Sequence, residues 1–173
     1  GLTADELAAK GAALCIATAE NFDAAEDMPW PIFFRELDAA FPGSKFVLTI
    51  RDSADWFRSI ETHFGDKAED MQAFVYGRDA AAPTGNRERY MSVYEAHNAA
   101  VLRHFAARPD DLLVMDLSRG DGWEKLSPFL GAPVPEASFP AKNRSFDRRR
   151  ISYRLKKKLF QLVGIAPAPE RLV

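Results

Sequence analysis

The fold is decided by residues 45–59, which read KFVLTIRDSADWFRS. Residues 46–50 form a short apolar run rich in strand formers, and this run predicts a strand that is buried on both faces, as strands of parallel sheets are. A helix is expected directly behind the strand, because Asp52 or Ser53 can cap it and Trp56, Phe57 and Ile60 recur at helical spacing.

Arg51 stands between this strand and this helix. In open parallel sheets ligands bind beyond the carboxyl ends of the strands, and a guanidinium beside a helix N-terminus stabilises an anion. The segment therefore predicts an anion site at Arg51. The alternative interpretation is that Arg51 only pairs with an acidic neighbour such as Asp52 or Asp55.

The rest of the chain alternates helical and strand patterns around this segment. Apolar residues at helical spacing predict helices, and short apolar runs predict strands. Residues 66–86 mix Gly, Pro and Ala with charged residues and predict an excursion that either forms a mobile lid or covers a substrate. The alternation predicts an α/β fold with a parallel sheet flanked by helices. Helices are expected at 3–19, 30–41, 87–108 and 123–130, and further strands at 22–26 and 112–117.

Composition places the chain among soluble globular proteins. It has 173 residues, 28% charged residues and a formal net charge of −2, which favours one domain and no nucleic-acid partner. A single cysteine and three scattered histidines predict a metal-free protein of a reducing compartment. No apolar run has the length of a membrane span and the N-terminus has no signal pattern, so we expect a cytoplasmic protein.

The chain resembles sulfotransferases that use 3'-phosphoadenosine 5'-phosphosulfate (PAPS). The resemblance is carried by Arg51 followed eight positions later by Ser59, behind a strand preceded by FPGSK, and by further segments in the family's order. It covers residues 22–143 and implies that Arg51 and Ser59 hold the 3'-phosphate of the cofactor. The further segments are FDAAEDMP at 22–29, YEAHN at 94–98, LLVMD at 112–116, GWEKLSPFLG at 122–131 and FPAKN at 139–143.

One feature of the family is missing from the sequence. The resemblance implies a P-loop nucleoside triphosphate hydrolase-like fold that opens with a strand and a Gly-x-x-x-Thr-Gly-Thr loop for the 5'-phosphosulfate. No such segment precedes Phe22. We expect the first strand and the P-loop to be absent from this chain, either because the sequence lacks an upstream segment of the full-length protein or because another chain supplies them. Residues 1–173 alone are then expected to be inactive and poorly stable.

The catalytic base is expected at Asp27. Cytosolic sulfotransferases place a histidine in a His-Leu-Pro segment at this point, and the present chain has Asp27-Met28-Pro29. A carboxylate can take this role when burial raises its pKa towards neutrality. Alternatively, Asp27 caps or orients the helix that follows. His97 is a weaker candidate, for lining an acceptor pocket.

Two further expectations concern the C-terminal part of the sequence. Lys142 and Arg144 lie where the wider family places a loop that closes over the 3'-phosphate, which makes them candidate cofactor-binding residues. Residues 147–163 are expected to form a basic amphipathic helix, whose charged face either remains in solvent or contacts an anionic membrane surface.

The function expected from the resemblance is transfer of a sulfuryl group from PAPS to a hydroxyl or amine acceptor, without a metal. One alternative is a non-catalytic member of the same fold that binds a nucleotide or a protein. A second is a nucleotide kinase of the same fold, which would need magnesium and ATP. The sequence does not identify the acceptor or the oligomeric state.

Overall fold

A computed structural model describes residues 4–140 of the protein. The chain divides into two units, residues 1–135 and 136–173, and every named element lies in the first unit. The elements, in chain order, are α1 (Ala4–Ala19), η1 (Trp30–Phe33), α2 (Phe34–Ala40), β1 (Phe46–Thr49), α3 (Ser53–Phe64), α4 (Asp70–Tyr76), η2 (Arg78–Ala80), α5 (Arg87–His104), η3 (Pro109–Asp111), β2 (Leu112–Met115), η4 (Leu117–Arg119) and α6 (Trp123–Phe129).

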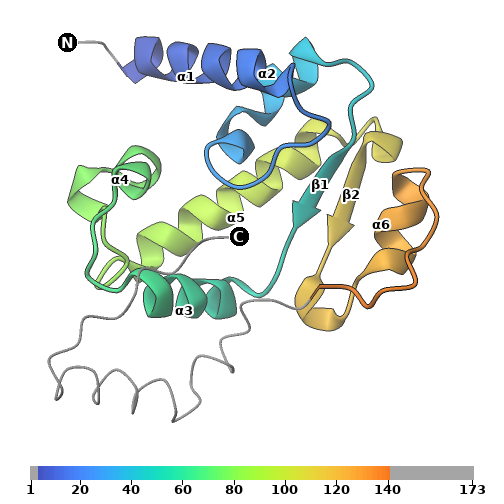
Figure 1. The fold of residues 1–173 in the computed structure, drawn as a ribbon. Coiled ribbons are helices and arrows are strands. Elements are labelled where there is room, and N and C mark those ends of the chain that lie inside the picture. The colour runs from blue at the N-terminus through green and yellow to red at the C-terminus, as the bar shows by residue number, and fades with distance from the viewer. Residues whose placement is uncertain (1–3, 141–173) are drawn as a thin grey trace, which may run out of the picture. The chain divides into compact units, whose positions relative to one another are not determined.

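The sheet of the described residues consists of β1 and β2, which pair in parallel (Figure 1). Phe46 lies opposite Leu112 and Thr49 lies opposite Met115. The connection between the two strands runs through α3, α4 and α5, as a parallel pair requires a long crossover. The structure therefore confirms a mixed architecture of helices and a parallel sheet.

The expected strand at residues 22–26 is wrong, because these residues form irregular backbone with a bend at Asp23. All five side chains are exposed, and four of the five residues are Asp, Ala or Glu, which are depleted in strands. A strand needs a neighbour to receive its backbone hydrogen bonds, and no strand pairs with this segment in the described part of the chain.

The expectation that β1 is buried on both faces is also wrong. Leu48 is buried against Phe34 of α2, against Val101 of α5 and against Phe105, the C-cap residue of α5. Val47, which points to the opposite face, is 43% exposed. In the described residues β1 therefore contributes one face to the core, because helices cover only that face.

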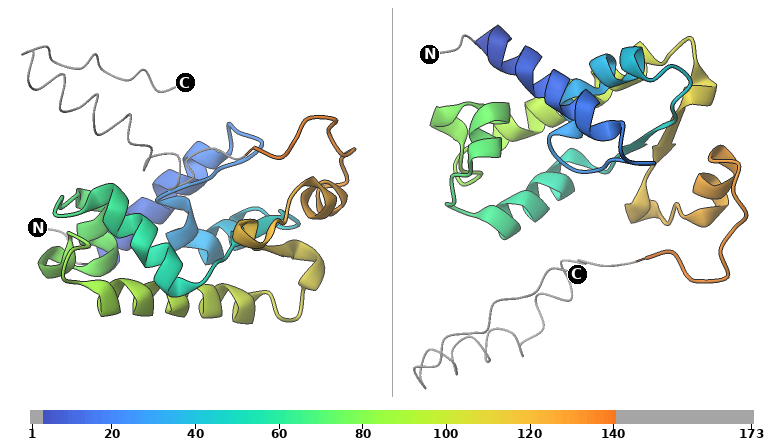
Figure 2. Two further views of the ribbon diagram at one scale, coloured as in Figure 1. Left: turned by 90° about the horizontal axis from the view of Figure 1, so that it is seen from below. Right: turned by 45° about the horizontal axis from the view of Figure 1, so that its top comes forward.

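A second core cluster joins α3, α4 and α5. Phe57 of α3 and Tyr76 of α4 pack against Tyr90, which is completely buried on α5, and Ala80 of η2 completes the cluster. Tyr76 and Tyr90 stack with ring centroids 3.6 Å apart. Both views in Figure 2 show α3 and α4 beside α5. Residues 66–86 therefore contain the helical elements α4 and η2 and contribute to the core, so the expectation of an excursion away from the core is wrong, whereas a role in covering a substrate stays a prediction.

The third cluster holds α1 to the segment that follows it. Ala12 and Cys15 of α1 pack against Phe33 of η1, and all three side chains are buried. The predicted helix at 3–19 is confirmed as α1, and the helix at 30–41 begins with the 3-10 turn η1 before it becomes α2. The observed α5, β2 and α6 confirm the elements predicted at 87–108, 112–117 and 123–130.

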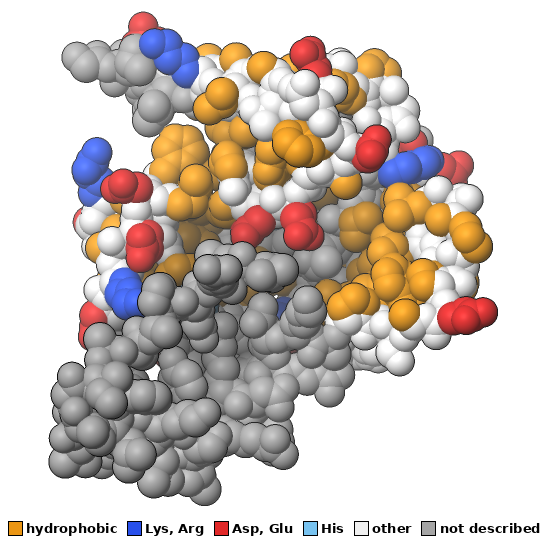
Figure 3. Space-filling view, in the orientation of Figure 1, with side chains coloured by type: hydrophobic (Ala, Val, Ile, Leu, Met, Phe, Trp, Pro, Cys, Tyr) orange, Lys and Arg blue, Asp and Glu red, His pale blue; other side chains and the backbone are white. Residues whose placement is uncertain are grey.

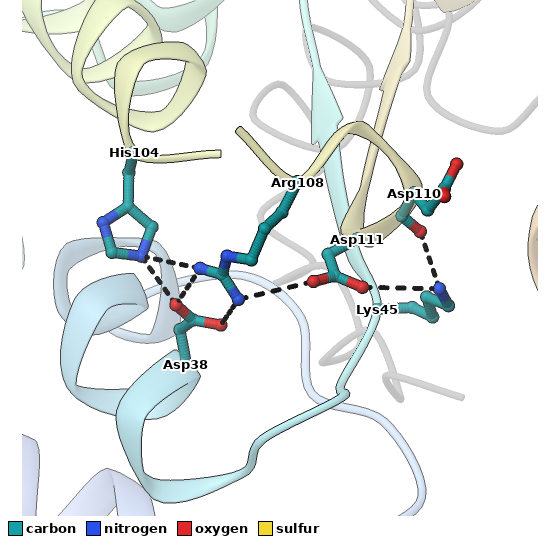
Figure 4. A network of polar contacts seen from close by, with 6 residues as sticks. All are labelled: Asp38, Lys45, His104, Arg108, Asp110 and Asp111. Atoms are coloured by element: carbon teal, nitrogen blue, oxygen red, sulfur yellow. Dashed lines mark hydrogen bonds and ion pairs between the residues drawn. The ribbon is translucent and has the colours of Figure 1, made fainter. Parts of the chain in front are cut away.

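Asp38 connects α2 to the end of α5 through charged contacts (Figure 4). Its carboxylate lies 2.7 Å from Nε2 of His104 and accepts hydrogen bonds from both terminal nitrogens of Arg108. The hydrogen bond from Arg108, together with the one from His104, holds the pKa of Asp38 below its ordinary value despite the burial of the carboxylate. We call these three residues the Asp38 clasp.

The Asp38 clasp continues to the start of both strands. Arg108 also contacts Asp111 at 3.3 Å, and Lys45 donates to the backbone oxygen of Asp110 at 2.6 Å. Lys45 directly precedes β1, and Asp111 directly precedes β2. These contacts fix the amino ends of the two strands and leave their carboxyl ends for other interactions.

Hydrophobic side chains also gather on the surface around α6 in Figure 3. Leu117, Leu130 and Val134, which flank this helix in the sequence, are 49%, 52% and 58% exposed. The surface around α6 therefore remains apolar in the described structure.

Candidate functional site

Arg51 lies just beyond the carboxyl end of β1, as the sequence predicts. Ile50 still belongs to the ladder, since its N–H donates to the oxygen of Met115 at 2.8 Å. Asp52 is the N-cap of α3, and its carboxylate accepts a hydrogen bond from the N–H of Asp55 at 3.0 Å. The change from strand to helix therefore takes place within two residues and places Arg51 at the edge of the sheet.

The side chains of Arg51 and Ser59 are in direct contact. The Nη1 of Arg51 donates to Oγ of Ser59 at 3.0 Å, and both residues are partly buried. Ser59 lies on α3, about one turn after Asp55 along the same helix. The two residues that the sequence places at a common site thus form a pair in the structure.

The alternative interpretation of Arg51, an ion pair with Asp52 or Asp55, does not match the described contacts. Asp55 instead pairs with Arg58 at 2.8 Å, and Asp52 accepts from the backbone. Within residues 4–140 no ion pair of Arg51 is recorded. The charge of Arg51 is therefore not neutralised by an acidic group in this part of the chain.

The Nε of Arg51 is buried and has no hydrogen-bond partner among residues 4–140. Leaving a buried donor without an acceptor costs about 1–3 kcal/mol, and more for a charged group. Such a group is rare in a folded protein and calls for an explanation. An acceptor supplied by a ligand would remove this cost.

Tyr94 of α5 holds the backbone of Arg51. Its hydroxyl accepts a hydrogen bond from the N–H of Arg51 at 3.0 Å and donates to the oxygen of the same residue at 3.3 Å. The ring of Tyr94 stacks on Trp56 of α3, with centroids 4.3 Å apart and an angle of 13° between the planes. The sequence identified Tyr94 only as part of the YEAHN segment of the family resemblance, because nothing local connects it with a residue 43 positions earlier.

Asp27, the predicted base, lies in the loop before η1. Its side chain is exposed, and its carboxylate accepts a hydrogen bond from the N–H of Met28 at 2.8 Å. The backbone oxygen of Asp27 accepts from the N–H of Trp30 at 3.2 Å, which places Asp27 at the start of η1. The burial that a carboxylate base requires is not present around Asp27 in the described structure.

The histidines on α5 differ in their surroundings. His97 lies with its ring edge-on to Phe34 at 5.8 Å, and burial, together with the positive charge of Arg35, lowers the pKa of His97. His104 belongs to the Asp38 clasp, so its role is structural. His97 is therefore held towards its neutral form one turn of helix after Tyr94.

The remaining predicted site residues cannot be compared with the geometry. Lys142, Arg144 and the basic segment at 147–163 lie outside the described residues. Within residues 4–140 no group of three or more His, Cys, Asp or Glu side chains is arranged to hold a metal ion. None of the helices in this range is long and apolar enough to cross a membrane.

Comparison with known proteins identifies the family. The family model described as "Sulfotransferase domain" matches residues 6–147. Since this match covers well over half of the sequence, the chain belongs to the sulfotransferase domain family, which carries out sulfuryl transfer in general.

A curated relative is the "Ava biosynthesis cluster protein M" of Aspergillus versicolor. It is 26% identical to this chain over an alignment of 148 residues, and the match covers 69% of this chain and 54% of the relative. The matched part of the chain thus spans about half the length of this relative.

Proposed function

We propose that this chain binds PAPS through its 3'-phosphate and takes part in transferring the sulfuryl group to a hydroxyl or amine acceptor. The observation that carries the proposal is the contact between Arg51 and Ser59 beside a buried Nε that has no acceptor in the described part of the chain. Membership of the sulfotransferase domain family supports the reaction class.

The chemistry of the pair suits a phosphate. Ser59 Oγ accepts from Arg51, so the hydroxyl proton of Ser59 remains available for a phosphate oxygen. The Nε and the second terminal nitrogen of Arg51 can donate to further oxygens of the same group. Charge-assisted hydrogen bonds from a guanidinium are about twice as strong as neutral ones, and the N-terminus of α3 adds a favourable field.

The 3'-phosphate lies away from the atoms that react, so Arg51 and Ser59 contribute by orientation. Binding energy from a remote part of a substrate can position the reacting centre. In the transfer, the acceptor oxygen or nitrogen bonds to sulfur while the bond from sulfur to the 5'-phosphate oxygen breaks. The acceptor's proton must pass to a base, a role that we propose for Asp27 when the bound acceptor shields it from water.

We further propose that β1 and β2 belong to a sheet of the P-loop nucleoside triphosphate hydrolase-like type. Their parallel pairing, and a ligand-facing residue at the carboxyl end of β1, support this assignment. The buried and unpaired Cys15 agrees with the proposal that the protein works in the cytoplasm.

Calorimetry with two nucleotides tests the proposal. We expect the full-length protein to bind 3'-phosphoadenosine 5'-phosphate more tightly than adenosine 5'-phosphate. The substitution Arg51→Ala should reduce this difference by about tenfold to a hundredfold, the range expected for charge-assisted hydrogen bonds. Ser59→Ala should reduce it less, because a neutral hydroxyl makes a weaker hydrogen bond.

Arg58 provides the matched control. It lies next to Ser59 on α3, but its side chain is 62% exposed and pairs with Asp55. The substitution Arg58→Ala removes the same charge and should leave the preference for the 3'-phosphate unchanged. Equal affinity for the two nucleotides in the wild-type protein, or an equal effect of Arg51→Ala and Arg58→Ala, would contradict the proposal.

The exposure of Asp27 favours a second candidate function, that of a nucleotide-binding member without catalysis. The two candidates differ in a transfer assay with PAPS and a panel of hydroxyl and amine acceptors. Catalysis predicts product formation that falls by about a hundredfold or more in Asp27→Asn, as expected for loss of a general base. Tight nucleotide binding with no turnover of any acceptor supports the non-catalytic function.

A further inference from the structure

We propose that Tyr94 is a positioning residue for Arg51. Its hydroxyl holds the backbone of Arg51 in place and thereby directs the guanidinium towards Ser59 and the anion. The ligand part of this inference rests on the proposed function, whereas the effect on Arg51 itself does not.

The first argument is the way in which the ladder of β1 ends. Ile50 donates to Met115 of β2, so Arg51, the next residue, turns its N–H and oxygen away from β2. Without Tyr94, both of these groups would lack a partner at this edge of the strand in the described part of the chain. The Tyr94 hydroxyl satisfies them together, at 3.0 and 3.3 Å.

The second argument is the fixed position of the Tyr94 ring. It stacks on Trp56, and Trp56 lies on the same helix as Ser59. The contacts of Tyr94 therefore join the end of β1, the first turns of α3 and the middle of α5. Any displacement of Arg51 relative to Ser59 would disturb the hydrogen bonds to Tyr94 or its stacking with Trp56.

The third argument concerns the cost of holding a charged side chain. Orienting an arginine loses rotamer entropy, and less is lost on binding when the side chain is already held. The guanidinium of Arg51 donates to Ser59 through Nη1, and its buried Nε has no acceptor among the described residues. Because Tyr94 fixes the backbone of Arg51, only the side-chain torsions of Arg51 have to be ordered when an anion binds.

The substitution Tyr94→Phe tests the inference, because it removes the hydroxyl and keeps the ring on Trp56. Tyr90→Phe is the matched control. Tyr90 lies one turn earlier on α5, is also stacked on an aromatic ring, and donates its hydroxyl to the backbone oxygen of Ala81 at 3.2 Å. Both variants lose a tyrosine hydroxyl, but only Tyr94→Phe loses a contact with Arg51.

The first measurement compares the two nucleotides in the full-length protein. We expect Tyr94→Phe to reduce the preference for 3'-phosphoadenosine 5'-phosphate over adenosine 5'-phosphate by about tenfold, the effect of one to two neutral hydrogen bonds. Tyr90→Phe should lower the thermal midpoint without changing the preference. A preference that is intact in Tyr94→Phe would overturn the inference.

The second measurement requires no ligand. Nitrogen-15 relaxation of the Nε–H of Arg51 reports the mobility of the guanidinium directly. We expect greater mobility in Tyr94→Phe than in the wild type or in Tyr90→Phe. If the wild type does not distinguish the two nucleotides, the proposed function fails, and this signal alone then decides the role of Tyr94. Equal mobility in all three proteins would overturn that role.

Discussion

Removing the carboxylate of Asp38 should destabilise the protein by about 2 kcal/mol. The side chain of Asp38 is only 9% exposed, whereas His104 and Arg108 are 26% and 43% exposed. Exposed ion pairs contribute about 0–1 kcal/mol and breaking a buried pair costs about 3–5 kcal/mol, so a half-buried clasp should lie between these limits. For a chain of this length we expect Asp38→Ala to lower the midpoint of thermal unfolding by about 4–8 °C.

The comparison with Asp55→Ala isolates the effect of burial. Asp55 also pairs with an arginine, Arg58, but the two side chains are 46% and 62% exposed. Urea unfolding followed by circular dichroism should give a loss of about 1 kcal/mol or less for Asp55→Ala. If Asp38→Ala costs no more than Asp55→Ala, the Asp38 clasp does not stabilise the contact between α2 and α5.

Acid provides an independent check on the Asp38 clasp. The pKa of Asp38 is below its ordinary value of 3.8 in the folded protein, so the stabilisation is complete above this value and is lost as the pH falls through the folded pKa. The difference in unfolding free energy between the wild type and Asp38→Ala should therefore shrink below about pH 4. A difference that stays constant down to pH 2 would refute this assignment.

Two further predictions concern α1 and α5. Gly11→Ala should destabilise the protein by about 1 kcal/mol in thermal unfolding, although alanine favours helices. The reason is that the added Cβ would lie 2.7 Å from the ring of Phe33, which is buried. Lys10→Ala, at an exposed position of α1, should leave the stability unchanged in the same assay. The substitution His97→Gln should reduce the loss of unfolding free energy that the wild type shows below pH 6.5. The folded state lowers the pKa of His97, so the unfolded chain binds more protons in this pH range. Urea titrations between pH 5 and 8 would contradict this if the unfolding free energy of wild type and variant changed with pH in the same way.

Much of the site followed from the local sequence. The apolar run at 46–50, the cap at Asp52 and the spacing of eight residues between Arg51 and Ser59 all lie within one strand and the helix behind it. Such a unit has few ways to fold, so its residues predict both the turn and the neighbouring side chains. The contact between Arg51 and Ser59 was thus within reach of sequence reasoning.

Errors arose where a prediction depended on what covers an element. An apolar run of five residues has the same sequence pattern whether one or both faces of the strand are covered. In the described structure, helices cover just one face of β1. Residues 66–86 carry enough Gly and Pro to suggest irregular backbone. They form α4 and η2 because Tyr76 and Ala80 are buried against Tyr90, which is a tertiary effect.

The sequence by itself determined the short units of this protein: a strand that ends at an arginine, a capped helix behind it, and the family to which these units belong. Only the tertiary structure decided the contacts between distant segments. Tyr94 reaches Arg51 across 43 residues, and Asp38 reaches Arg108 across 70. No local preference encodes such pairs, because they form only when the packing of α5 against β1 and α2 compensates the entropy of closing the long loops between them.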